Sequence, residues 1–195
     1  KAAGRNAIRF FDPQMQVVVS AHAALEVDMR EALAARQFLV HYQAQMDSAG
    51  RMVGVEALVR WQHHKRGMIH PAEFISLAED TGLIRPLGKW VLETTCRQLK
   101  TWEANPATAH LTIAVNISVQ QFYARDFVDQ VLAVVRQSGA NPQKLKLEIT
   151  ESLLLKDIEA IIEKMRILIQ EGVKFSLDDF GTGYSSLSYL KHLPL

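Results

Sequence analysis

Segments with the two-residue period of a β-strand alternate along this chain with segments that have the period of a helix. Phe38, Val40 and Tyr42 alternate as in a strand, and a turn at residues 48–50 leads to a second strand at 53–60. Strands separated by helix-length segments predict right-handed βαβ units around a parallel sheet, either closed as a barrel or open and doubly wound. The other expected strands are 111–117, 144–149 and 173–177, and the expected helices are one that Ser20 caps, one that Pro71 opens, and three at 87–102, 126–138 and 157–170.

The composition excludes several classes of protein. With 48% hydrophobic and 22% charged residues the chain has the balance of a globular protein, and its 195 residues suit one domain. A formal net charge of +1 provides no basic field for long nucleic acid or an acidic membrane. The single cysteine, Cys96, cannot form an internal disulfide, and no apolar run approaches the roughly 20 residues that span a bilayer. These features predict a cytoplasmic protein with no membrane contact from this segment.

Four of the expected strands carry an oxygen-bearing side chain near the carboxyl end, on the face opposite their aliphatic residues. The four side chains are those of Glu56, Asn116, Glu148 and Asp178, and Asp179 follows the last of them. In a barrel the carboxyl ends of the strands form the functional end, so these groups are expected to share one mouth. Each of them alone is an ordinary strand-end residue, but agreement in four strands makes coincidence the poorer explanation.

Carboxylates gathered in one mouth repel each other unless cations neutralise them. Oxygen ligands favour hard ions such as Mg²⁺, Mn²⁺ or Ca²⁺ over Zn²⁺. A set of this size predicts a site that holds two divalent ions and supports an in-line attack on a phosphodiester.

Four short motifs follow one another along these strands. They are Glu56-Ala57-Leu58-Val59-Arg60-Trp61, Asn116-Ile117-Ser118, Glu148-Ile149-Thr150-Glu151 and residues 178–186, which contain two glycines. Together, over roughly residues 20–195, they resemble the EAL domain, the bacterial phosphodiesterase family that hydrolyses cyclic di-GMP. The resemblance implies a TIM-like (β/α)8 barrel of the α/β class. It also implies a metal-dependent phosphodiesterase that converts cyclic di-GMP to linear pGpG in second-messenger signalling.

The resemblance implies a metal-binding role for five residues. Glu56, Asn116, Glu148 and Asp178 would bind one ion, and Asp178 and Asp179 would help to bind a second. The ions would be Mg²⁺ or Mn²⁺. Within this set, Glu56, Asp178 and Asp179 are expected to be catalytic.

The same resemblance implies binding or supporting roles for four other residues. Arg60 would contact a phosphate of the substrate, and Gln43 would lie near the bound nucleotide. Glu151 would anchor the loop of residues 178–186 at Ser185 rather than bind substrate.

The resemblance further implies a larger parent protein. Residues 1–19 are expected to be a linker with the end of an upstream GGDEF (diguanylate cyclase-like) domain, and residues 20–195 an EAL domain whose C-terminal part is missing. That part would carry a lysine that assists the attacking water and a further glutamate ligand. We therefore expect an incomplete barrel, with activity in the full-length parent and none in this segment alone. A homodimer through the EAL domain is also expected, and any anchoring to the inner membrane would come from other segments.

A catalytically inactive receptor for the same nucleotide is the alternative function. Receptors of this family usually lose members of the acidic set or of the loop motif, whereas those expected within residues 1–195 are all present. A purely structural interaction domain would give no reason for aligned carboxylates. The sequence therefore favours the enzyme.

A second copy of the triplet Glu-Ala-Leu occurs at residues 31–33. It lies inside an expected helix with Leu33 on the apolar face, whereas the triplet at residues 56–58 ends a strand and is followed by Arg60. Only the second triplet therefore fits the signature.

Three histidines, His63, His64 and His70, are considered as a transition-metal site. They lack the i,i+4 pair of a helical site and a cysteine partner. They are therefore expected on a polar loop rather than around an ion.

Overall fold

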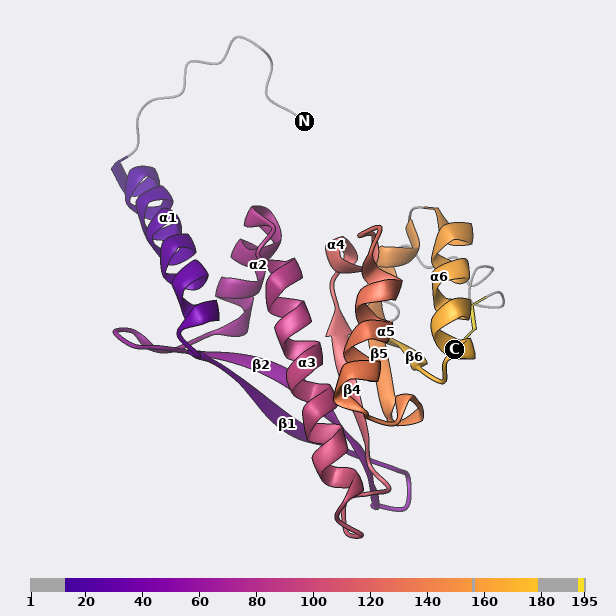
Figure 1. The fold of residues 1–195 in the computed structure, drawn as a ribbon. Helices are drawn as coiled ribbons and strands as arrows, with labels where there is room; N and C mark the ends of the chain where they lie inside the picture. Colours follow the sequence, from indigo (N-terminus) through magenta and orange to yellow (C-terminus); the bar gives the residue numbers. More distant parts are fainter. Residues whose placement is uncertain (1–12, 156, 179–192, 195) are drawn as a thin grey trace.

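One curved sheet runs through most of the protein (Figure 1). A computed structural model describes residues 13–155, 157–178 and 193–194 of the chain. In that part of the chain six strands form the sheet in the order β1-β2-β4-β5-β6, with β3 paired to β2. The strands are β1 (Phe38–Met46), β2 (Met52–His63), β3 (Gly67–Ile69), β4 (Thr112–Ile117), β5 (Leu145–Thr150) and β6 (Lys174–Asp178).

The sheet is parallel from β2 through β4 and β5 to β6, as the alternation of strands and helices predicts. β1 instead pairs with β2 in antiparallel fashion, with Phe38 opposite Trp61 and Gln43 opposite Glu56. A short turn joins these two strands, and such a turn permits only an antiparallel hairpin. The βαβ prediction therefore holds from β2 onward, and β1 adds an antiparallel strand at one end of the sheet.

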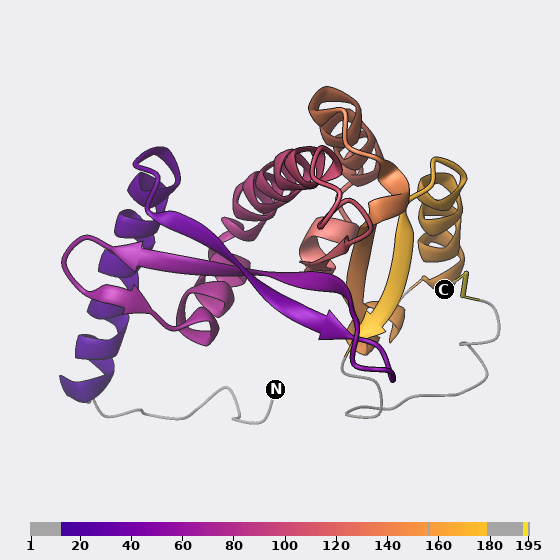
Figure 2. The same ribbon diagram turned by 90° about the horizontal axis from the view of Figure 1, so that it is seen from below.

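Helices cover one side of the sheet, and Figure 2 shows α3, α5 and α6 along that side. The prediction that Ser20 caps the first helix is wrong, because α1 begins at Pro13 and continues through Ser20, where no helix end needs a cap. No helix within the described residues combines the length and the apolar character needed to cross a bilayer. The helices are α1 (Pro13–Ala34), α2 (Pro71–Thr81), α3 (Ile84–Glu103), α4 (Val119–Phe122), α5 (Phe127–Ser138) and α6 (Ile158–Gln170), with 3₁₀ turns η1 (Pro142–Lys144) and η2 (Glu151–Leu155).

The aliphatic faces of the strands pack against these helices to form the core. Ile113 and Val115 of β4 and Leu147 and Ile149 of β5 are at most 1% exposed. Burial of one such side chain stabilises the fold by about 1.5–3 kcal/mol. Cys96 of α3 belongs to the same cluster, and burial raises the pKa of its thiol to about 12, as befits a packing residue rather than a nucleophile.

Gly54 allows β2 to approach β4 closely. A Cβ atom at this position would lie 2.8 Å from the carbonyl oxygen of Thr112 and would also meet the Thr112 hydroxyl. A side chain there would push the two strands apart. Because Glu56 follows two residues later on the same face of β2, this close approach also sets the position of Glu56 relative to β4.

A buried histidine joins α1 to the end of β2. His63 is 1% exposed, and its Nδ1 accepts hydrogen bonds from the backbone amides of Lys65 and Arg66 at 3.0 and 3.2 Å. Nε2 therefore carries the proton and donates to Oδ2 of Asp28 at 3.0 Å, and this bond lowers the pKa of Asp28. The expectation that His63 lies on a polar loop is wrong. It is the last residue of β2, and a helix distant in sequence supplies its partner.

Replacing His63 by phenylalanine is expected to lower the free energy of unfolding by about 2 kcal/mol, since two amides and Asp28 lose their imidazole partner. His64 is exposed, so His64→Phe is the matched control and should change this free energy by about 0.5 kcal/mol or less. Urea denaturation of wild type and both variants measures the changes. Equal effects of the two substitutions would contradict the role of His63.

Candidate functional site

The register of the parallel strands brings three of the predicted site residues together. Asn116 of β4 lies opposite Glu148 of β5, so both side chains point to the same face of the sheet. Nδ2 of Asn116 donates a hydrogen bond of 2.7 Å to Oε1 of Glu56 on β2. Glu56, Asn116 and Glu148 therefore occupy neighbouring positions on three adjacent strands, on the face turned away from the helices. The expectation that the triplet at residues 56–58 ends a strand is wrong, because β2 continues to His63 and Glu56 lies inside it.

Glu148 lies at the centre of a small hydrogen-bonded network and is only 9% exposed. Oγ of Ser176 on β6 donates to Oε1 of Glu148 at 3.2 Å, and Nζ of Lys146 lies 3.5 Å from the same oxygen. Lys146 also donates to Oε1 of Gln45 on β1 at 3.3 Å. Two strands separate β1 from β5 in the sheet order, so this bond crosses the open face and requires the curvature seen in Figure 2.

Asp178 lies farther along the sheet than the other predicted ligands. It is the exposed last residue of β6 and pairs with Thr150, two residues beyond Glu148. Within the part of the chain that the structure describes, no three His, Cys, Asp or Glu side chains gather closely enough to hold a metal ion. Asp179, the fifth predicted ligand, and Ser185 fall outside the described residues. The structure thus groups the predicted ligands of β2, β4 and β5, and the predicted ligand of β6 follows at the end of the next strand.

The predicted substrate-binding residues lie on β1 and on β2, the strand that carries Glu56. Gln43 of β1 is opposite Glu56 in the antiparallel ladder, so these side chains share a face. Arg60 follows on β2, and its Nη1 donates to the carbonyl oxygen of Val59 at 2.9 Å, so the guanidinium lies back on its own strand. Glu151, the predicted loop anchor, is 8% exposed at the start of η2.

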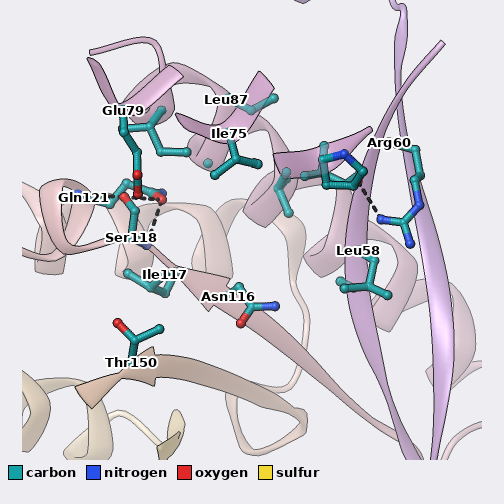
Figure 3. Close-up of a pocket in the computed structure, with 16 residues that line it drawn as sticks. Leu58, Arg60, Ile75, Glu79, Leu87, Asn116, Ile117, Ser118, Gln121 and Thr150 are labelled. Atoms are coloured by element: carbon teal, nitrogen blue, oxygen red, sulfur yellow. Dashed lines mark hydrogen bonds between the residues drawn. The ribbon is translucent and has the colours of Figure 1, made fainter. Parts of the chain in front are cut away.

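A pocket of about 290 Å³ opens between the strand ends and three helices (Figure 3). Leu58, Arg60, Asn116 and Thr150 line it from the sheet. Its size is near the lower end of the range for small-molecule sites. The opposite wall is not predicted from the sequence, because its residues come from helices whose position relative to the strand ends is set only by the fold. That wall contains Ile75 and Glu79 of α2, Leu87 and Gly88 of α3, and Gln121 of α4.

A close contact at Gly88 holds α4 against α3. Ser118 caps α4, because its Oγ accepts a hydrogen bond from the amide of Gln121 while Oε1 of Gln121 accepts one from the amide of Ser118. The side chain of Gln121 fills the space that a Cβ atom at residue 88 would occupy. Since this capping box directly follows Asn116 and Ile117, it fixes the end of β4 at the pocket. The Ser-x-x-Gln spacing of residues 118 and 121 is the sequence signal that predicts such a capping box.

The family of the chain follows from comparison with known proteins. The sequence profile of the EAL domain matches residues 26–195. The chain belongs to the EAL domain family. The predicted family is thereby confirmed.

Curated relatives of this EAL domain are much longer proteins. The chain is 44% identical over 195 residues to the bifunctional diguanylate cyclase/cyclic di-GMP phosphodiesterase MucR of Pseudomonas aeruginosa, covering 100% of this chain and 28% of that protein. It is 37% identical over 195 residues to the cyclic di-GMP phosphodiesterase PdeR of Escherichia coli, covering 100% of this chain and 29% of that protein. The chain therefore spans less than a third of the length of these relatives.

Solved structures share the fold of this EAL domain. The c-di-GMP complex of PaMucR phosphodiesterase matches with a TM-score of 0.83 at 45% identity, covering 88% of this chain and 69% of that one. The EAL enzyme Bd1971 in its cAMP and cyclic-di-GMP bound form matches with a TM-score of 0.83 at 27% identity, covering 91% of this chain and 49% of that one. These likenesses confirm the predicted α/β fold, the TIM-like barrel of the EAL type.

Gly88→Ala is expected to lower the free energy of unfolding by about 1–3 kcal/mol, because the new methyl group displaces the amide of Gln121. Gln121→Ala alone removes the bond from the Ser118 amide to the Gln121 side chain, which is half of the capping box, and should cost about 1 kcal/mol. The double variant should be more stable than the sum of the single changes predicts, since the clashing amide is gone. Urea denaturation of the four proteins completes the cycle, and purely additive effects would contradict the contact.

Proposed function

We propose that this EAL domain, in its natural full-length protein, is a metal-dependent phosphodiesterase that hydrolyses cyclic di-GMP to linear pGpG. The proposal rests on the grouping of Glu56, Asn116 and Glu148 on one face of three adjacent strands, near the carboxyl ends of β4 and β5. The pocket that contains Arg60 and Asn116 lies at the same strand ends. Relatives named as cyclic di-GMP phosphodiesterases and the c-di-GMP complex of PaMucR support the choice of substrate.

The donor set suits two hard divalent ions, Mg²⁺ or Mn²⁺. Carboxylate and amide oxygens are the ligands that such ions prefer. The amide nitrogen of Asn116 is the atom bonded to Glu56, which leaves the amide oxygen of Asn116 as a ligand. One ion would take Glu56, Asn116, Glu148 and Asp178, and the other Asp178 and Asp179. When bound, such ions supply an activated water and neutralise charge on the phosphodiester.

The chain's own side chains would bind and orient the substrate. The guanidinium of Arg60 would exchange the carbonyl oxygen of Val59 for a phosphate oxygen, a stronger charge-assisted bond. Gln43 would hydrogen-bond the nucleotide beside the metal ligands, since it shares a face with Glu56. Glu151 would act through the loop at Ser185 and not on the substrate.

The proposed setting of the domain is a longer cytoplasmic signalling protein. Residues 1–19 would be a linker with the end of a GGDEF domain, residues 20–195 would form the EAL domain without its C-terminal part, and two such domains would form a homodimer. The diguanylate cyclase in the name of MucR supports a cyclase domain in the same protein. The proposed boundary falls inside α1 (Pro13–Ala34), so this helix would connect the two domains.

Glu56→Gln is expected to lower kcat for cyclic di-GMP hydrolysis at least about 100-fold in the full-length protein with Mn²⁺, because a metal ligand loses its charge. Glu31→Gln in the other Glu-Ala-Leu triplet is the matched control. Glu31 is an exposed residue of α1, so activity should stay within about twofold of wild type. Formation of pGpG measures both. Equal losses would refute the assignment of the metal ligand, and nucleotide binding without turnover by wild type would identify a receptor instead.

Arg60→Gln is expected to raise the KM for cyclic di-GMP about tenfold, because a charge-assisted hydrogen bond to a phosphate is lost. Arg66→Gln is the control, since Arg66 is exposed beyond the end of β2 and is not among the pocket-lining residues. Steady-state kinetics of the two variants provide the comparison. An unchanged KM in Arg60→Gln would show that this guanidinium does not bind the substrate phosphate.

A further inference from the structure

A lysine on the same strand lies next to Glu148, the most buried of the proposed metal ligands in the described part of the chain. Lys146 and Glu148 are two residues apart on β5, so both side chains point to the open face of the sheet. Nζ of Lys146 lies 3.5 Å from Oε1 of Glu148, and the two side chains are 26% and 10% exposed. The same ammonium donates to Oε1 of Gln45 at 3.3 Å, which holds it in place from β1.

In the described part of the chain, the hydrogen bond and the ion pair of Glu148 both involve the same carboxylate oxygen. Ser176 and Lys146 both approach Oε1. Among the described residues no hydrogen bond or ion pair reaches Oε2. Lys146 supplies a positive charge beside this buried carboxylate without taking the second oxygen.

We propose that Lys146 is a resident counter-cation of Glu148 that sets the affinity of the site for divalent metal. In the metal-free protein its ammonium balances the buried carboxylate through Oε1. When an ion binds, two cations share one carboxylate, and their repulsion weakens metal binding. Lys146 is thus a residue that tunes the site, not a catalytic residue, and the inference rests on the proposed function.

The sign of the effect separates this role from a merely structural one. If Lys146 only positioned Glu148, its loss would loosen the ligand and weaken metal binding, as the loss of outer-shell partners usually does. If it acts as a counter-cation, its loss removes repulsion and strengthens metal binding. The two roles therefore predict opposite changes in the dissociation constant for the metal.

Lys174 provides a matched control. It pairs with Lys146 across the β5–β6 ladder, so both lysines share a face of the sheet. Lys174 is exposed, and none of the contacts found for Glu148 in the described part of the chain involves it. Lys174→Met thus removes the same charge one strand away without removing a partner of Glu148.

The experiment is a titration of the full-length protein with Mn²⁺ in the absence of nucleotide, with free Mn²⁺ measured by electron paramagnetic resonance. Lys146→Met should lower the dissociation constant about three- to tenfold. Lys146→Gln, which keeps a hydrogen-bond donor without the charge, should do the same and serves if the methionine variant does not fold. Lys146→Arg and Lys174→Met should stay within about twofold of wild type.

Thermal melting gives a second reading that does not depend on activity. Without metal, Lys146→Met should melt at a lower temperature than wild type, because Glu148 loses its counter-charge. Added Mn²⁺ should raise the melting temperature of this variant by more than that of wild type. Unchanged or weaker Mn²⁺ binding in the Met and Gln variants, or equal tightening in Lys174→Met, would overturn the inference. Absence of Mn²⁺ binding by wild type would instead overturn the proposed function on which it rests.

Discussion

The register between β4 and β5 is the constraint on which the candidate site depends. With Asn116 opposite Glu148, the intervening aliphatic residues face the helices and the polar residues face away from them. Because side chains alternate, a slip by one residue would turn Glu148 into the core and Leu147 onto the open face. Burial of Leu147 on one side of the sheet therefore fixes the orientation of Glu148 on the other. In this way α3 and α5 orient the site from the opposite side of the sheet.

The strands on either side of this pair complete the site by different means. Gly54 lets β2 lie close to β4, and Glu56 thereby comes within hydrogen-bond distance of Asn116. β1 contributes through curvature, since Gln45 reaches Lys146, 101 residues later in the chain, across the open face. A flat sheet would keep β1 and β5 apart, because two strands lie between them. Two contacts therefore shape the open face: the close approach of β2 to β4 at Gly54, and the bond between Lys146 and Gln45 across the curved sheet.

The strand period predicts β2, β4, β5 and β6 to within a few residues, because each of these strands has one face that must be buried. The same period predicts that Glu56, Asn116 and Glu148 share a face, and it already places Lys146 and Ser176 with them, although only register shows which atoms meet. Contacts between distant segments escape such a pattern. His63 is buried with a partner, Asp28, that lies 35 residues away in the chain. Ser20 caps no helix because α1 already begins at Pro13. The helical wall of the pocket depends in the same way on how α2, α3 and α4 dock.

Contacts within the fold hold the acidic side chains of the open face. Asn116 donates to Glu56, and Ser176 and Lys146 approach Glu148, so both carboxylates have partners within the fold. Asp178 is exposed at the end of β6. Among the residues that the structure describes, the contacts to Glu148 reach Oε1, and the bond that Asn116 donates uses its nitrogen and leaves its oxygen. Contacts within the fold and binding of an ion can therefore use different atoms of the same side chains, so the ligand set can be held in place and still bind a metal ion.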